Sequence, residues 1–552
     1  MFRTITPAGL GLVCSAFFVA ACGPPEVTAP SFVNAPFGAA SATFSMTLTP
    51  NGNTLDEVRV VPELAVLAMN VVPGSPDHYT RDFSPSACHR FVPYYYDVRY
   101  ASNLPGAASG LLSEREPPAG SFLLRRSGTP PQDCRLVEGL DLVVDTTADL
   151  TDANPGDGVC AASNGACSLR AAIMETNARA GHDRISVPPG EYVLRLFGSE
   201  SLDEPNDAID DLDILDGLYL VGQSSSTVIL DGDHQSRLLQ VAAGSYDFVN
   251  VTGFTLRNGY ESGEPGGAVH NASNTRIEGV KLLDNHLNPG TSTCAASVSL
   301  EVCNRGGAVF NKGRLLLRRV TIQDNSTCGS SGCDDSGQGG GISNFGPSAR
   351  LFVETSTVAN DSARFIGALH NWQGTVRVLN STFADNRSSG WVSDVYNAGD
   401  GDVTIRHATF ASSTDLPVLV NSTVGDFDAG TMHLESSVVH MDVEGASLCT
   451  GTLALNSTTF VGGFYEDWDY VGACKFGTGY KPNVVRFSVG ALQNNGGTTD
   501  TIEILDGYDS GKIFDAGSTV CPNRDQAGVI RTGDADGPGK LGCDPGALEQ
   551  SR

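Results

Sequence analysis

The stretch Gly266-Gly267-Ala268-Val269-His270-Asn271 recurs as Gly306-Gly307-Ala308-Val309-Phe310-Asn311, and weaker copies end at Asn344, Asn371 and Asn397. The later copies lie about 25 residues apart, the period of a unit that stacks on itself. An apolar residue, an outward residue and an asparagine describe a short strand entering a tight turn, because asparagine tolerates left-handed backbone. We therefore expect stacked coils in which successive asparagines satisfy one another's buried amides in a ladder.

A second phrase follows each copy, beginning with Leu282-Leu283-Asp284-Asn285. Alignment on it produces two columns that are apolar throughout: Leu282, Ile322, Val358, Phe383 and Phe410, and Ile277, Leu317, Val353, Val378 and Ile405. The column beside the first is polar and is expected to face outward: Lys281, Thr321, Thr357, Thr382 and Thr409. Alternation with period two predicts strands rather than helices. The predicted fold class is all-β, a right-handed parallel β-helix; a β-sandwich with regularly spaced turns is the alternative.

The composition limits the classes of partner. The 552 residues include 35 Lys and Arg against 63 Asp and Glu, a formal charge of −28. Such an acidic surface disfavours nucleic acid and anionic membrane surfaces as partners. It favours solubility and binding of cations, and we expect a monomer.

The chain begins like an exported protein. Arg3 precedes the apolar run Leu10–Ala21, which is too short to span a bilayer as a mature helix. The run ends in Val19-Ala20-Ala21-Cys22, which resembles a bacterial lipoprotein lipobox. The resemblance implies that residues 1–22 are a signal peptide, that Cys22 carries lipid and, since Gly23 follows, that the protein sorts to the outer membrane and cell surface. An ordinary secretory signal with a chance cysteine is the alternative.

The cysteines agree with export. Of 14 cysteines, twelve remain after Cys14 and Cys22 are set aside, and oxidising compartments permit disulfides. Nearest neighbours are expected to pair, because each coil of a solenoid touches only its neighbours. The predicted pairs are Cys88–Cys134, Cys160–Cys167, Cys294–Cys303, Cys328–Cys333, Cys449–Cys474 and Cys521–Cys543.

The chain divides into a Pro-rich tether at 23–31, a small sandwich-like β-domain at 32–138, the β-helix at 139–489 and a C-terminal module at 490–552. Ser168 is expected to cap a short helix that covers the open end of the solenoid. The phrase Cys167–Ala172 resembles the Cys-Ser-Leu-Arg-Glu-Ala motif of a bacterial surface-protein family, with Ala171 where Glu is usual. Residues 184–194 resemble the first coil of pectin-lyase-like β-helices, and Cys543–Glu549 belongs to a stretch similar to choice-of-anchor modules, which implies surface retention.

One column offers a candidate binding surface. The residue before each asparagine of the first phrase should point outward, and five positions form a strip on one face: His270, Phe310, Ser343, His370 and Tyr396. Aromatic and imidazole rings stack on sugars or anchor protein partners. The alternative is that loops cover these side chains and they only pack.

The Gly-Gly-Ala-Val phrases also resemble the paired tetrapeptides of polymorphic outer-membrane protein adhesins. We therefore expect a non-catalytic surface lipoprotein that binds a glycan or protein ligand. No outward column offers two acids with a nearby unpaired base, but pectin-lyase-like folds often carry polysaccharide lyases or glycoside hydrolases, so an enzyme of that kind is the first alternative. A structural envelope protein is the second.

Calcium is the one cofactor that the sequence suggests. Two acidic loops could supply its oxygen ligands. The first contains Asp149, Asp152, Asn154 and Asp157, and the second contains Asp203, Glu204, Asp207, Asp210, Asp211 and Asp213. Neither has EF-hand spacing, and turn formation is the alternative role of these residues.

Overall fold

The computed structural model of the chain describes the strands of the N-terminal region and most residues from 139 onward. The described ranges from that point are 139–179, 181–198, 208–244, 248–262, 264–288, 304–327, 337–423, 430–443, 446–455, 459–463, 472–476, 483–505, 510–514, 524–529 and 543–549, with single residues 516, 522 and 531.

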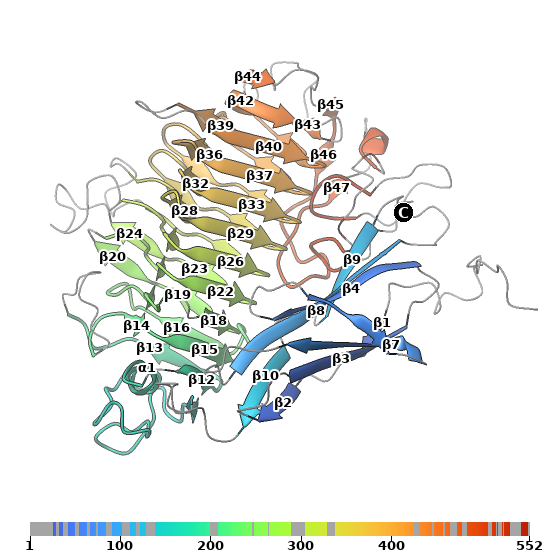
Figure 1. Cartoon of the computed structure of the whole chain (residues 1–552). Coiled ribbons are helices and arrows are strands. Elements are labelled where there is room, and N and C mark those ends of the chain that lie inside the picture. The colour runs from blue at the N-terminus through green and yellow to red at the C-terminus, as the bar shows by residue number, and fades with distance from the viewer. Residues whose placement is uncertain are drawn as a thin grey trace, which may run out of the picture.

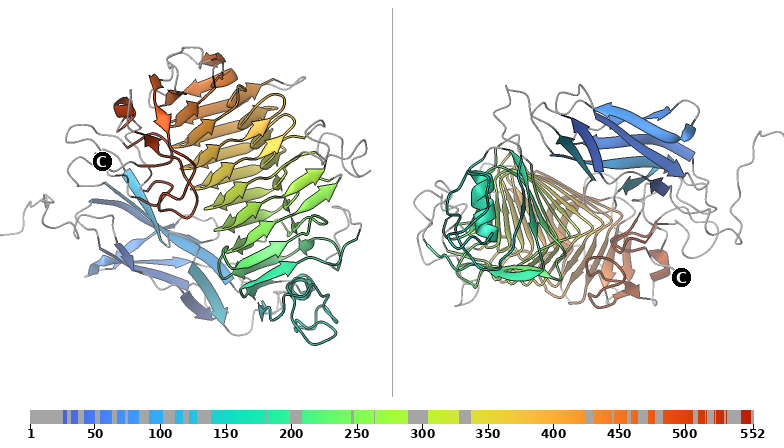
Figure 2. Two further views of the ribbon diagram at one scale, coloured as in Figure 1. Left: turned by 180° about the vertical axis from the view of Figure 1, so that it is seen from behind. Right: turned by 90° about the horizontal axis from the view of Figure 1, so that it is seen from below.

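The described residues from Asp141 to Arg486 form the predicted parallel β-helix, with coils that stack along one axis (Figure 1). The coils contribute strands to three faces, and the three-sided outline is visible along the axis (Figure 2). Face 1 contains β14 (Leu212–Ile214), β17 (Leu239–Val241), β21 (Val269–Asn271), β25 (Val309–Asn311), β28 (Ile342–Phe345), β32 (Leu369–Trp372), β36 (Val395–Ala398), β39 (Leu419–Ser422), β42 (Cys449–Leu455) and β44 (Gly472–Phe476).

Face 2 contains β11 (Asp141–Val143), β12 (His182–Val187), β15 (Gly217–Gly222), β18 (Phe248–Thr252), β22 (Asn274–Glu278), β26 (Arg314–Arg318), β29 (Arg350–Glu354), β33 (Thr375–Leu379), β37 (Asp402–Arg406) and β40 (Thr431–Glu435). Face 3 contains β13 (Gly190–Val193), β16 (Val228–Asp231), β19 (Thr255–Arg257), β23 (Lys281–Leu283), β27 (Thr321–Gln323), β30 (Thr357–Ala359), β34 (Thr382–Ala384), β38 (Thr409–Ser412), β41 (Val438–Met441), β43 (Phe460–Gly463) and β45 (Asn483–Arg486). Two short parallel pairs follow face 3 strands along the chain and precede face 1 strands. They are β20 (Tyr260–Ser262) with β24 (His286–Asn288), and β31 (Ser362–Ala363) with β35 (Arg387–Ser388).

The interior confirms the aligned columns. Both apolar columns are 0–2% exposed, and they belong to one continuous core that runs the length of the coils. The predicted asparagine ladder is also present: the side-chain amide of Asn271 donates to Asn311 at 2.7 Å, and the same bond repeats through Asn344 and Asn371 to Asn397. Asn421 extends the ladder by one coil at 2.9 Å. Each buried amide is thus satisfied by its neighbour, which locks the register of the coils.

The paired glycines of the repeat have separate tasks. Gly266 and Gly306 have φ of 84° and 77°, a left-handed conformation that side chains with a Cβ disfavour. Gly267 has no such φ, but a Cβ there would collide with the carbonyl oxygen of Gly307 in the next coil. The first glycine therefore permits the turn and the second permits close stacking.

The predicted helical cap is α1 (Leu169–Asn177). The hydroxyl of Ser168 accepts a hydrogen bond from the backbone N–H of Ala171 at 3.0 Å, as an N-cap residue does. Arg170 is buried and bonds Asp149 and the carbonyl oxygens of Asp210 and Asp211. The helix therefore closes the first coil and ties two loops to it.

The N-terminal region forms two sheets, as a small β-domain predicts. One contains β1 (Glu26–Thr28), β3 (Ala42–Thr49), β7 (Ser75–Phe83) and β6 (Asn70–Val72), and the other β2 (Phe32–Pro36), β10 (Phe122–Ser127), β8 (Phe91–Ala101), β4 (Thr54–Pro62), β5 (Leu67–Ala68) and β9 (Leu111–Glu116). Strand β1 lies within the stretch expected to be a tether, and it pairs with β3.

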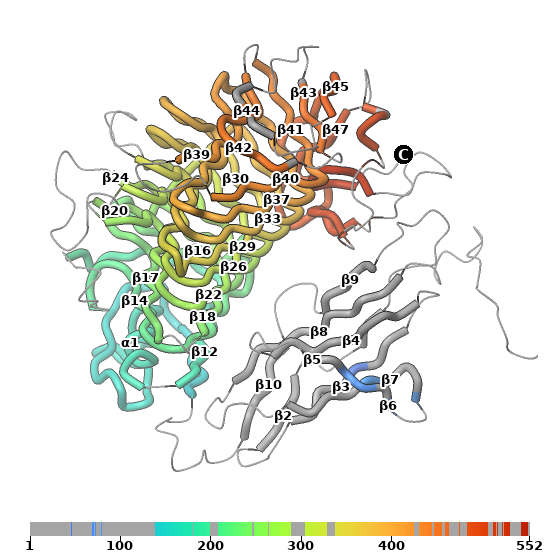
Figure 3. The backbone as a smooth tube through the Cα atoms, turned by 45° about the horizontal axis from the view of Figure 1, so that its top comes forward, coloured from blue at the N-terminus to red at the C-terminus, as the bar shows by residue number. Residues whose placement is uncertain are grey.

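The C-terminal segment, with β46 (Ser488–Val489), β47 (Ile504–Leu505) and η3 (Ser510–Lys512), lies along face 3 (Figures 1 and 3). Its polar groups bond the threonine column, for example the backbone N–H of Ala547 to the Thr409 hydroxyl at 2.8 Å. The column therefore points away from the core, as expected, but Thr357, Thr382 and Thr409 are only 0–2% exposed because the C-terminal segment covers them.

Candidate functional site

The predicted ligand-binding column is in register but is not accessible. Strand pairing aligns its five members on adjacent coils of face 1, as expected. Their exposed fractions are 0–5%: His270, Phe310, Ser343, His370 and Tyr396. The expectation of an open strip is therefore wrong, and the alternative, in which these side chains are covered, is the one that the structure shows.

The column packs as a stack of rings with an arginine beside it. His270 stacks on Phe310 with ring centroids 5.4 Å apart, and His370 lies 5.7 Å from Tyr396. Burial lowers the pKa of His370 well below its usual value, with Arg305 as the second cause. The ring is therefore neutral, and its Nδ1 lies 2.8 Å from the Nη1 of Arg305. This arrangement stabilises face 1 rather than presenting a cation to solvent.

Aromatic side chains outside the predicted column reach the surface above it. We define Phe345, Phe365, Trp372 and Trp391 as the aromatic patch. Phe345 stacks on Trp372 at 6.4 Å with ring planes 11° apart, and Phe365 lies 4.6 Å from Trp391. Trp391 is 52% exposed, the others are half-buried, and both pairs join adjacent coils. The sequence signal was the proximity of Trp372 and Trp391 along the chain, but no period predicted Phe365.

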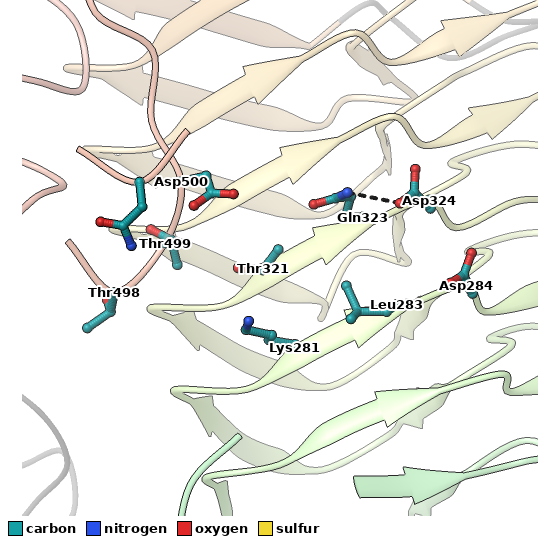
Figure 4. A pocket seen from close by; sticks show the side chains of 10 residues that line it. Lys281, Leu283, Asp284, Thr321, Gln323, Asp324, Thr498, Thr499 and Asp500 are labelled. Carbon is teal, nitrogen blue, oxygen red and sulfur yellow. Dashed lines mark hydrogen bonds between the residues drawn. The ribbon is translucent and has the colours of Figure 1, made fainter. Parts of the chain in front are cut away.

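A polar groove of about 210 Å³ lies on face 3, at its border with the C-terminal segment (Figure 4). Strands β23 and β27 form its floor, and a stretch at 494–500 forms its wall. Its lining residues are Lys281, Leu283, Asp284, Thr321, Gln323, Asp324, Asn494, Thr498, Thr499 and Asp500. Lys281 is exposed and makes no ion pair with any described residue. The groove could hold the hydroxyl groups of a sugar, which these amide, hydroxyl and carboxylate groups can bond.

The first acidic loop does not have the form of a calcium site. Asp149 pairs with Arg170 at 2.7 Å, and the carboxylates of Asp152 and Asp157 accept backbone N–H groups two residues ahead at 2.8 Å. Asn154 is exposed. Within the described part of the chain, no three His, Cys, Asp or Glu side chains are placed to hold a metal ion. The oxygens of these side chains form turns and an ion pair, which is the alternative role that the sequence left open.

The second acidic loop contributes to an ion cluster that sequence reasoning missed. Arg237 pairs with Asp211 at 2.5 Å and lies 3.5–3.6 Å from Glu264 and Glu261. Burial raises the pKa of Glu261 to about 7, against the lowering effect of Arg237. Three carboxyl groups thus surround the guanidinium of Arg237, just before strand β17 of face 1. Asp203, Glu204 and Asp207 lie outside the described residues.

Two predicted disulfides are confirmed: Cys160–Cys167 and Cys449–Cys474. Cys543 is also disulfide-bonded, while its expected partner Cys521 lies outside the described residues. Cys22, the predicted lipidation residue, also lies outside the described residues, as do Cys88, Cys134, Cys294, Cys303, Cys328 and Cys333.

Comparisons with protein-family models, with characterised proteins and with solved structures find no match to this chain. Among the described residues, no helix has both the length and the apolar character that a membrane span requires.

Proposed function

We propose that this chain is a cell-surface lipoprotein that binds a glycan through the aromatic patch and does not convert it chemically. One observation carries the proposal: Trp391 is 52% exposed and its ring is braced by Phe365, 4.6 Å away. A large apolar ring usually lies inside a soluble protein, and Trp391 is exposed beside three half-buried rings, so this part of the surface is the candidate for binding. A second ring pair, Phe345 and Trp372, is linked to Trp391 through the buried rings of His370 and Tyr396.

The geometry suits a rigid, non-catalytic platform. The patch stands on strands whose positions are set by the asparagine ladder and by the buried ring stack below. Such support holds the rings in place before the ligand arrives, which lowers the entropy cost of binding. The lipobox ending at Cys22 supports anchoring at the outer membrane as part of the same proposal.

Glycan-array screening of the full chain, followed by calorimetry, tests this function. We expect Trp391→Ala to weaken binding of the selected glycan about tenfold, because a stacked ring contributes on the order of 1–2 kcal/mol. Phe197→Ala is the matched control, since Phe197 is 42% exposed but lies outside the patch. Equal affinity of the Trp391 variant and the parent protein would remove the patch as the binding surface.

The polar groove favours a second candidate function, a polysaccharide lyase or glycoside hydrolase. Its basis is the exposed Lys281, which is a candidate base, beside Asp284 and Asp324 on adjacent coils. Incubation with acidic and neutral polysaccharides, followed by assay of reducing ends and unsaturated products, tests this activity. The lyase is supported if product forms and Lys281→Ala abolishes it; product formation that Lys281→Ala leaves unchanged places the chemistry elsewhere.

A further inference from the structure

Three cations lie together at the corner between face 1 and face 2: Lys312, Arg314 and Arg350. Lys312 and Arg314 are exposed, and Arg350 is half-buried. Strand pairing places Arg314 directly opposite Arg350 on the next coil. Neighbouring strands are about 4.8 Å apart, so two like charges face each other at close range, an arrangement that is unfavourable by itself.

None of the three cations has an acidic partner among the described residues. Other arginines on face 2 do have such partners: Arg377 pairs with Asp402 at 2.6 Å and Arg406 with Glu435 at 3.0 Å. In a chain with 63 acidic residues against 35 basic ones, an unpaired group of cations is the exception. The group therefore presents a local positive field on an otherwise acidic protein.

The two arginines are also held in place. The guanidinium of Arg314 lies 5.9 Å from the centroid of the Phe352 ring. Arg350 donates from Nη1 to the carbonyl oxygens of Pro347 and Ala349 at 2.8 and 2.9 Å, and this leaves its other N–H groups available. A fixed guanidinium binds a carboxylate, sulfate or phosphate group through paired hydrogen bonds.

The cations continue the aromatic patch rather than lying apart from it. Asn311 and Asn344 are paired in register on adjacent coils, so Lys312 and Phe345, the residues that follow them, occupy equivalent positions. Phe345 in turn pairs with Trp372 on the next coil. A ligand lying over the patch therefore reaches the cations at the corner.

We infer that the glycan bound by this surface is acidic, with carboxylate, sulfate or phosphate groups that lie on Lys312, Arg314 and Arg350 while its sugar rings stack on the aromatic patch. This inference rests on the proposed glycan-binding function and names its ligand class. Selectivity follows from charge: elsewhere the acidic surface repels such a polymer, so binding is confined to this corner.

Binding of the full chain to an oligogalacturonate and to the same oligomer with its carboxylates methyl-esterified tests the inference, with a sulfated and a phosphorylated oligosaccharide and their neutral forms as further pairs. We expect the parent protein to bind at least one acidic oligosaccharide more tightly than its neutral form. The double variant Arg314→Gln/Arg350→Gln should bind that acidic oligosaccharide about tenfold more weakly than the parent does. Raised salt should reduce the preference. The matched control is Arg377→Gln/Arg406→Gln, which removes the same charge from the same face but from ion-paired positions.

The two proposals fail differently. If Trp391→Ala has no effect while Arg314→Gln/Arg350→Gln abolishes binding of an acidic form, the aromatic proposal is wrong and the acidic ligand class stands. If the parent prefers none of the acidic forms, or if both double variants lose affinity equally, the acidic ligand class is wrong. Binding to phosphatidylglycerol vesicles without binding to any acidic oligosaccharide also overturns it, because a lipid surface is then the ligand.

Discussion

The side-chain oxygen of Gln526 accepts a hydrogen bond from the hydroxyl of Thr382, 2.7 Å away and 144 residues earlier in the chain. The amide nitrogen of the same glutamine donates to the hydroxyl of Thr357 at 2.9 Å and to the carbonyl oxygen of Ser356 at 3.0 Å. One buried amide thus joins the C-terminal segment to two coils of the β-helix. The segment is part of the solenoid's packing and not a separate appendage.

Gln526→Ala should destabilise the docked segment. The substitution leaves the buried hydroxyl of Thr382 without its acceptor, while the hydroxyl of Thr357 keeps its bond to the carbonyl oxygen of Asp500, and an unsatisfied buried group costs about 1–3 kcal/mol. We expect earlier proteolytic release of the C-terminal segment and a lower urea midpoint. Asn494→Ala is the control, because Asn494 is exposed on the same segment. Identical proteolysis of both variants would show that Gln526 does not secure the segment.

Phe310→Ala should destabilise the β-helix itself. Phe310 is fully buried and stacks on His270, so its removal leaves a cavity that costs about 3–5 kcal/mol. Trp391→Ala, at a half-exposed ring, should change the free energy of unfolding far less. Chemical denaturation compares the two variants, and equal losses would contradict the burial assigned to Phe310.

Asp361→Asn should stabilise the protein increasingly as the pH rises from about 4 to 7. A second ladder of buried side chains runs through Asn285, Asn325, Asp361 and Asn386. Asp361 is fully buried there and accepts a hydrogen bond from the side-chain amide of Asn325 at 2.9 Å, and burial raises its pKa well above the usual value. The unfolded chain loses this proton first, at a pKa of about 3.9, so the parent loses stability as the pH rises above that value. Asparagine has no such proton to lose. Denaturation at pH 4 and pH 7 measures the difference, and a gain that is the same at both pH values would show that Asp361 is not protonated in the fold.

Removal of the Cys449–Cys474 disulfide should cost more than removal of Cys160–Cys167. The sequence separations are 25 and 7 residues, and the loop-entropy relation assigns them about 3.5 and 2.4 kcal/mol. Paired Cys→Ser variants and thermal denaturation provide the comparison. The reverse order would show that local packing outweighs loop entropy here.

Cys22→Ser should release the protein from the outer membrane or block its processing, because a serine at this position offers no thiol for acylation. Membrane fractionation and mass spectrometry of the mature N-terminus follow the outcome. A variant that still fractionates with the outer membrane and is cleaved at the same site would rule out a lipid anchor at Cys22.

The periodic part of the sequence was sufficient to predict the fold. Columns such as Leu282 to Phe410 and the ladder from Asn271 to Asn397 repeat with the coils, so their inward positions follow from alternation alone. Register is readable for the same reason: a slip by one residue would move every apolar side chain to the outer side of its strand. The cap residue Ser168 and the pairing of Cys160 with Cys167 are local features, and local spacing predicted them.

Only the tertiary structure decided which outward positions meet water. Alternation shows that Phe310 and Thr382 point away from the core. It does not show that Phe310 is buried on face 1, or that Gln526 covers Thr382. The groove at Lys281 depends on a contact between face 3 and residues 494–500, which are distant in sequence. A repeat determines contacts between neighbouring coils because their sequence separation is constant. Segments outside the repeat have no such constant separation, so their contacts follow only from how the whole chain packs.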